Sequence, residues 1–133
     1  MTIPVTSWEE RAAEFKAELA AKIPPKWVIE QRSSTNVSYI TATSGLLDAR
    51  ELEIIQHDAS ALAKAIARKA YTATEVAVAY AKAGAVVHQA TNCVMDFDLE
   101  TALERAKWLD AELERTGKPV GPFHGVPISI KGW

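Results

Sequence analysis

The stretch Gly121-Pro122-Phe123-His124-Gly125-Val126-Pro127-Ile128-Ser129-Ile130-Lys131 decides the fold class of this sequence. It belongs to a segment, residues 117–132, in which seven of sixteen residues are glycine or proline. Proline fixes φ and glycine permits tight turns, so the path of the chain is strongly restricted here. Ile128 and Ile130 alternate with Ser129 and Lys131, which is the period-2 pattern of a strand with one apolar face. We therefore predict a turn followed by a strand over residues 127–131.

A single short strand leaves backbone hydrogen-bonding groups unsatisfied unless other strands lie beside it. The rest of the sequence offers one weak candidate, the apolar run Cys93-Val94-Met95. The sequence therefore predicts an α/β protein in which helices precede a strand of a sheet that further chain would supply. Without that sheet, we expect Ile128 and Ile130 to stay partly exposed and Lys131 to keep access to water.

Apolar residues at helical spacing, with capping boxes ahead of them, predict that most of the chain is helical. Three pairs have capping-box spacing: Ser7 with Glu10, Asp48 with Glu51, and Thr72 with Glu75. Asp98 and Gly117 have the residue types that begin and end a helix. The predicted helices are residues 7–23, 48–56, 59–69, 73–90 and 98–116, and residues 26–47 are predicted to be an irregular connection.

Two groups of residues in these helices call for a packing explanation. Trp8, Phe15, Leu19 and Ile23 lie on one apolar stripe of the first helix. We interpret Trp8, Phe15 and the later Trp27 as core or docking residues. Gly84 lies inside the predicted helix 73–90, where glycine costs up to ~1 kcal/mol relative to alanine, and this predicts a local reason for it.

The composition is that of an ordinary globular protein. The 133 residues are enough for one small domain, and 48% are hydrophobic while 24% are charged. Fifteen basic and seventeen acidic residues give a net charge of −2, which lacks the positive charge that binds nucleic-acid phosphates. No apolar run approaches the ~18 residues of a membrane span, and residues 1–11 lack the features of a signal peptide. We expect neither a nucleic-acid nor a membrane partner.

Cysteine and histidine positions argue against disulfide and metal chemistry. The single cysteine, Cys93, has no partner for a disulfide within the chain and is interpreted as a small buried hydrophobe. His57, His88 and His124 lie far apart without zinc-ligand spacing, so no metal site is predicted. A lone thiol without a recognisable export signal favours a soluble protein of the reducing cytoplasm.

The segment 121–131 closely resembles the Gly-Pro-Leu-His-Gly-x-Pro-x-x-x-Lys pattern that carries the catalytic lysine of amidase signature enzymes. Ala102-Leu103, Ala106 and Leu109-Asp110 resemble the family's helix Ala-Leu-x-x-Ala-x-x-x-Asp. The stretches 44–47, 72–76 and 88–93 resemble the fungal acetamidase branch. The resemblance covers about residues 44–131, and residues 7–43 more loosely.

This resemblance implies an amidase-signature fold, of which the chain holds mainly the N-terminal helices and the first strand. Residues 1–47 would form an N-terminal helix and irregular connection. Residues 48–133 would form the N-terminal part of the amidase domain.

The resemblance also implies hydrolysis of small-molecule carboxylic amides to a carboxylate and ammonia or an amine, without a cofactor or a metal. In the family a serine attacks the amide carbonyl, and a second serine in an unusual cis peptide passes its proton toward a lysine. Backbone N–H groups of a glycine-rich turn stabilise the oxyanion. The lysine must be neutral to accept a proton, and burial favours the neutral form. The matching position is Lys131, the one catalytic residue predicted.

Each residue of this segment also has a plainer interpretation. From the residues alone, Lys131 is most simply a strand-terminal lysine whose ammonium group reaches solvent. The resemblance favours the family position. His124 is interpreted as a packing residue of the turn, and Ser129 as a neighbour of Lys131 rather than a catalytic serine.

The sequence departs from the family pattern after the lysine. Gly132 stands where an aspartate usually follows. The glycine- and serine-rich stretch that supplies both catalytic serines follows the lysine in the family, and the pair Ser33-Ser34 lacks the flanking glycines to match it. Two functions therefore remain open. One is an amidase represented by its N-terminal part and inactive alone; the other is a non-catalytic remnant or helical interaction module prone to self-association.

Overall fold

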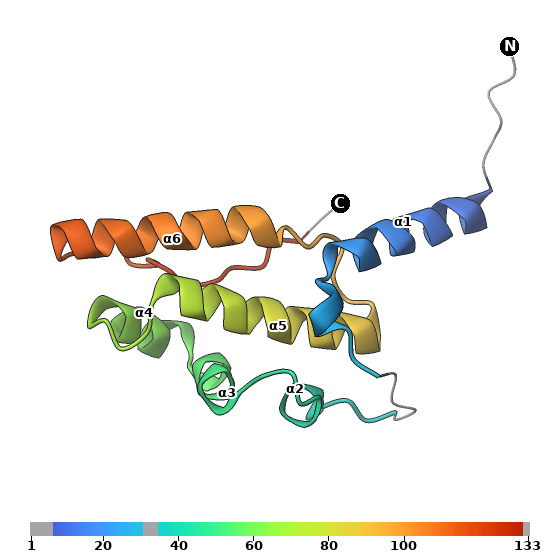
Figure 1. Ribbon diagram of the computed structural model, residues 1–133, viewed down its shortest axis with the longest axis horizontal. Coiled ribbons are helices and arrows are strands. Elements are labelled where there is room, and N and C mark those ends of the chain that lie inside the picture. The colour runs from blue at the N-terminus through green and yellow to red at the C-terminus, as the bar shows by residue number, and fades with distance from the viewer. Residues whose placement is uncertain (1–6, 31–34, 132–133) are drawn as a thin grey trace, which may run out of the picture.

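The computed structural model describes residues 7–30 and 35–131, and every regular element in these ranges is a helix (Figure 1). The predictions made for Ser33, Ser34 and Gly132 lie outside the described residues. No helix of the described ranges is both long and apolar enough to cross a membrane. The elements in chain order are α1 (Trp8–Lys22), the 3-10 helix η1 (Pro25–Trp27), α2 (Ile40–Thr43), α3 (Ala49–Gln56), α4 (Ala59–Ala67), α5 (Ala73–Thr91) and α6 (Leu99–Thr116).

The five predicted helices are confirmed, because their ends are determined by local hydrogen bonds. Capping boxes begin three of them, with both reciprocal bonds present, at Ser7, Asp48 and Thr72. The carboxylate of Asp98 accepts from the N–H of Thr101 and begins α6. Gly117 ends α6 with φ at +67°, the left-handed conformation that glycine adopts at little cost.

Two boundaries differ from the prediction. Helix α4 ends at Ala67 rather than at residue 69, because Lys69 takes a left-handed conformation with φ of 60°. The N–H groups of Lys69 and Ala70 then donate to the carbonyls of Ile66 and Ala65, which closes the helix end. The connection 26–47 is less irregular than predicted, since η1 overlaps its start and α2 lies within it.

The predicted strand at 127–131 is wrong for the described residues: segment 126–131 has no regular structure. The physical reason is the one that limits any lone strand, because the described chain contains no second strand with which it could pair. The run Cys93–Met95 is not a strand either. The predicted exposure is confirmed, since Ile128 and Ile130 are 70% and 89% exposed and Lys131 is exposed.

Helix α5 is the centre of the structure. It packs against α6 on one side and against α3 and α2 on the other, and α6 runs antiparallel beside it (Figure 1). The main core joins α3, α4, α5 and α6 through fully buried aliphatic side chains, among them Ile54, Leu62, Ile66 and Val76. Burying each such side chain contributes about 1.5–3 kcal/mol, so this cluster holds the four helices together.

Only part of the apolar stripe of α1 is buried. Leu19 and Ile23 are buried, whereas Trp8 and Phe15 are 71% and 44% exposed, and α1 projects from the other helices (Figure 1). Of the two interpretations, core or docking residues, the core interpretation is therefore wrong for Trp8 and Phe15, and a docking role for them stays a prediction. Trp27 is a core residue as predicted; it is buried with Ile23 and meets the ring of Phe97 edge to face.

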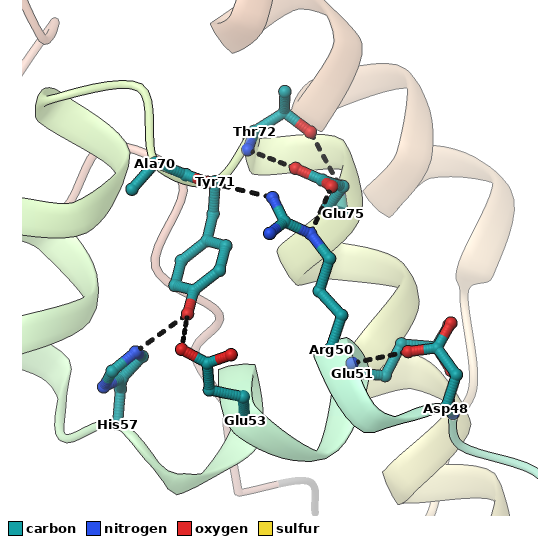
Figure 2. Close-up of polar contacts among 9 residues, drawn as sticks. All are labelled: Asp48, Arg50, Glu51, Glu53, His57, Ala70, Tyr71, Thr72 and Glu75. Atoms are coloured by element: carbon teal, nitrogen blue, oxygen red, sulfur yellow. Dashed lines mark hydrogen bonds and ion pairs between the residues drawn. The ribbon is translucent and has the colours of Figure 1, made fainter.

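A polar cluster attaches α3 to the connection between α4 and α5 (Figure 2). Arg50 donates through Nε to Glu75 at 2.8 Å and through its terminal nitrogen to the carbonyl of Ala70 at 2.9 Å. Its guanidinium also lies 4.9 Å from the centre of the Tyr71 ring, a cation–π distance. The hydroxyl of Tyr71 donates to Glu53 at 2.7 Å. The hydrogen bond from Arg50 lowers the pKa of Glu75, so this carboxylate stays ionised into mildly acidic solution.

A second ion pair joins α3 to α5 directly. The ammonium of Lys82 lies 2.6 and 2.8 Å from the two carboxylate oxygens of Glu51, and both side chains are largely shielded from water. Glu51 also accepts from the N–H of Asp48 in the capping box. One carboxylate therefore fixes both the start of α3 and its position on α5.

Gly84 has no steric reason to be glycine in this structure. A Cβ added there would meet Phe97 Cε2 at 3.9 Å, which is ordinary van der Waals contact. We expect Gly84→Ala to stabilise the chain by about 0.5–1 kcal/mol, because alanine loses less conformational entropy in a helix. The measurement is the free energy of unfolding in urea. Unchanged or reduced stability would show that Phe97 needs this space.

Candidate functional site

The candidate site is formed by the glycine- and proline-rich segment that follows α6. The segment returns along the α5–α6 pair and ends near the start of α6 (Figure 1). The N–H of His124 donates to the carbonyl of Gly121, and the N–H of Val126 donates to the carbonyl of Phe123. These two bonds form turns rather than a helix or a strand. The side chain of Val126 packs against the main core.

An open cleft of about 1200 Å³ lies between this segment, α5 and α6. Its walls are mainly apolar, with small alanines on both helices and the loop 93–98 at one end. Polar and charged groups on the lining are few; they include Asp96, Asp98, Arg105, His124, Ser129 and Lys131. A cleft with an apolar wall and a few polar groups is the usual form of a small-molecule site.

Lys131 and Ser129 lie in this lining, and both are exposed. The structure therefore brings the predicted lysine and its neighbour to the same cleft. The other serines of the described chain do not line the cleft. Among the described residues, no serine other than Ser129 joins Lys131 there.

His124 is buried, as expected of a packing residue, with 4% of its surface exposed. Its Nδ1 accepts a hydrogen bond of 3.1 Å from the N–H of Val120, so the neutral ring carries its proton on Nε2. Nε2 is buried and has no hydrogen-bond partner among the described residues. Burial lowers the pKa of His124 below its ordinary value, which keeps the ring neutral at neutral pH.

Asp110 supports the walls of the cleft without lining it, and the sequence pattern did not reveal this role. It lies on α6 but caps the first turn of α5: its carboxylate accepts from the N–H of Ala73 at 2.6 Å and from the N–H and hydroxyl of Thr74 at 3.0 and 2.6 Å. A negative charge at a helix N-terminus is further stabilised by the helix dipole. Asp110 therefore locks the two helices that form the cleft walls. The family-like motif contained this aspartate, and the motif was the one signal that could have identified it.

We expect Asp110→Ala to destabilise the chain by about 2–4 kcal/mol, because it removes three hydrogen bonds to a charged acceptor and leaves partly buried donors unpaired. The free energy of unfolding in urea measures this loss. Asp98→Ala is the matched control, since it removes one capping bond from an exposed helix start and should cost about 1 kcal/mol. Equal losses in the two variants would contradict the locking role of Asp110.

Cys93 contradicts its predicted burial. The thiol is exposed, in the loop that follows α5. The reason is that Asn92 adopts the left-handed conformation, with φ of 53°, and α5 therefore ends at Thr91. Cys93 therefore lies in the loop after α5, where it is one of the residues that line the cleft.

Comparison with known sequences agrees with this architecture. The family model described as "Amidase" matches residues 75–132, which include nearly all of α5, the whole of α6 and the segment with Lys131. The chain belongs to the amidase family. The fold class predicted from the sequence is confirmed at this level.

Among its relatives are fungal acetamidases. The chain is 38% identical to the acetamidase of Emericella nidulans over 126 residues, covering 94% of this chain and 23% of that protein. It is 37% identical to the acetamidase of Aspergillus oryzae, covering 97% of this chain and 24% of that protein. An amidase of Gibberella moniliformis is 34% identical, with 94% and 25% covered. The chain thus spans about a quarter of the length of these relatives.

A solved structure supports the same assignment. Fatty acid amide hydrolase superimposes on 92% of this chain with a TM-score of 0.80 and 30% sequence identity, and the match covers 23% of that protein. The helical arrangement of this chain is therefore similar to that of one part of fatty acid amide hydrolase.

Proposed function

We propose that this chain supplies the lysine-bearing part of an amidase that hydrolyses carboxylic amides of small molecules, with Lys131 as the base. The observation that carries the proposal is the segment 121–131, which has the family's lysine pattern and lies along the cleft between α5 and α6. In the complete enzyme, residues 48–133 would be part of the catalytic domain, and residues 1–47 an N-terminal helix and connection. We place the enzyme in the cytoplasm, where an exposed lone thiol such as Cys93 stays reduced.

The chemistry assigned to Lys131 follows from what an amine can do. A neutral lysine accepts the proton that the nucleophilic serine loses through a second serine, and the serine then attacks the amide carbonyl. Lys131 is exposed in this chain. In the proposed enzyme, the sheet would cover Ile128 and Ile130 and bury Lys131 beside them, which would favour the neutral amine.

The proposal is tested with a chimeric amidase in which residues 1–131 replace the matching quarter of the Aspergillus oryzae acetamidase. We expect the chimera to hydrolyse acetamide, with ammonia release as the measurement. A chimera that melts like the parent acetamidase but releases no ammonia would contradict the proposal. We expect residues 1–133 alone to release none, because among the described residues Ser129 is the one serine that lines the cleft with Lys131, and we interpret it as a neighbour rather than a nucleophile. Turnover by the purified chain that disappears in Lys131→Ala would contradict that expectation.

A second candidate function is favoured by the exposed apolar side chains. Phe123, Ile128 and Ile130 are 64%, 70% and 89% exposed on one segment, which suits an interaction module that associates with itself or with another protein. Sedimentation velocity over a range of concentrations tests self-association. A monomer at every concentration would remove the self-associating form of this candidate.

A further inference from the structure

Two hydrogen bonds, one to the His124 ring and one from its backbone N–H, close the turn around this residue. The N–H of Val120 donates to Nδ1 of His124 at 3.1 Å, and the backbone N–H of His124 donates to the carbonyl of Gly121 at 3.2 Å. The imidazole therefore acts as the acceptor that fixes the start of the segment leading to Lys131. A protonated ring has a hydrogen on Nδ1 and has no acceptor to offer Val120.

The His124 ring is also buried. Only 4% of His124 is exposed, and its Nε2 is buried without a hydrogen-bond partner among the described residues. The adjacent Gly125 lies so close to α4 and α5 that an added Cβ would be 3.0 Å from Ile66 and 2.9 Å from Ala73. A charge on this ring would be buried with no described group to accept from Nε2, which is costly.

We propose that neutral His124 is the positioning residue that holds segment 120–131 on helices α5 and α6, and that protonation of its ring releases the segment. The charged groups that act on the ring are Asp110 and Arg105, both on α6, while Ile66 of α4 and Ala73 of α5 lie against the adjacent Gly125. The negative charge of Asp110 offsets part of the cost of charging the ring, but its carboxylate bonds to Ala73 and Thr74 at the start of α5, and Nε2 of His124 has no partner among the described residues. The consequence for Lys131 as a base rests on the proposed function; the release of the segment does not.

The direction of the pH dependence follows from burial. Burial lowers the pKa of His124, Asp110 opposes this shift and Arg105 adds to it. The unfolded or released segment has an ordinary histidine pKa near about 6.5 and therefore binds the proton more tightly than the docked segment. The stabilisation of the docked segment is complete above about pH 6.5 and is lost as the pH falls toward the lowered pKa of the docked ring. One proton changes the docking equilibrium by at most about tenfold per pH unit.

The test is an NMR titration of the 133-residue chain between about pH 7.5 and 4.5. We expect the His124 ring signals to titrate below the ordinary histidine pKa, and the amide signals of residues 120–126 to move with the same midpoint. Over the same interval, hydrogen-exchange protection of these amides, corrected for intrinsic exchange, should fall by up to about tenfold per pH unit. Protection that stays constant while His124 titrates would overturn the proposal.

Two variants separate positioning from general packing. His124→Asn keeps a neutral acceptor near the position of Nδ1, and we expect it to remove the pH dependence while keeping the segment protected. His88 makes the same kind of bond elsewhere, accepting from the N–H of Val94 at 3.2 Å, so His88→Asn should leave the pH response of residues 120–126 unchanged. A pH response that survives in His124→Asn would overturn the proposal. If that variant does not fold, the agreement or disagreement of the two midpoints in the unaltered chain decides. Because no readout depends on amide hydrolysis, failure here is distinct from failure of the proposed function.

Discussion

Replacing Lys131 by alanine in the chimeric amidase is expected to slow amide hydrolysis by about 100- to 10,000-fold, the usual cost of removing a general base. The physical reason is that the nucleophilic serine keeps its proton when no neutral amine can receive it. The measurement is kcat for ammonia release from acetamide. Melting temperatures of the variant and the chimera show whether the loss is chemical rather than a loss of folded protein.

Two further variants decide what property of Lys131 matters. Lys131→Arg keeps a positive charge that does not lose its proton near neutral pH, so it should be as inactive as Lys131→Ala if the residue acts as a base. Lys118 is another exposed lysine of the stretch that follows α6, and Lys118→Ala should retain full activity. Activity in Lys131→Arg would show that the charge alone is needed. Equal losses in Lys118→Ala and Lys131→Ala would indicate general damage to the segment.

The helices could be predicted because the information that forms them is local. Ser7 and Glu10, or Thr72 and Glu75, are three residues apart, and their reciprocal bonds form wherever the chain begins a helix. The strand predicted at 127–131 is wrong because its formation is not local. The alternation of Ile128 and Ile130 describes a side-chain pattern, whereas a strand also needs backbone partners, and the described chain supplies none.

The contacts that shape the site are long-range, and periodicity does not reveal them. Asp110 binds backbone groups 36 and 37 residues earlier, and Arg50 pairs with Glu75, 25 residues later. No spacing rule connects such positions. The predicted burial of Cys93 is wrong for a similar reason: residue type alone suggested a buried thiol, whereas Cys93 lies exposed in the loop after the left-handed Asn92. The prediction that Lys131 is a catalytic lysine rests on the family motif, because its exposed position in this chain does not indicate such a role.

The whole site depends on how closely the segment with Lys131 approaches the helices. Asp110 holds α5 and α6 together, His124 closes the turn, and Gly125 permits the contact with Ala73. Asp110 acts between two helices, and His124 acts within the turn. Gly125 acts where the backbone of the segment lies against the helices. Gly125 does not tolerate a side chain, because its backbone is left-handed and because an added Cβ would lie too close to neighbouring atoms.

We expect Gly125→Ala to destabilise the chain by about 3 kcal/mol. Its φ is +75°, and a side chain in this left-handed conformation costs roughly 1–2 kcal/mol. The added Cβ would also lie 2.9 Å from Ala73 Cβ and 3.0 Å from Ile66 Cδ1, and such overpacking costs about 1–3 kcal/mol. The free energy of unfolding in urea measures the total, and hydrogen exchange shows whether residues 120–131 have left the helices.

Two glycines of the same stretch separate the two contributions to this loss. Gly117 has a similar φ of +67° with nothing within 4 Å of its added Cβ, so Gly117→Ala should show the conformational cost alone, about 1 kcal/mol. Gly121 also has open space and no left-handed φ, so Gly121→Ala should change stability by less than about 0.5 kcal/mol. If Gly125→Ala costs no more than Gly117→Ala, the segment does not press against Ala73 and Ile66. In that case the position of Lys131 would depend on the hydrogen bonds of the turn rather than on this close contact.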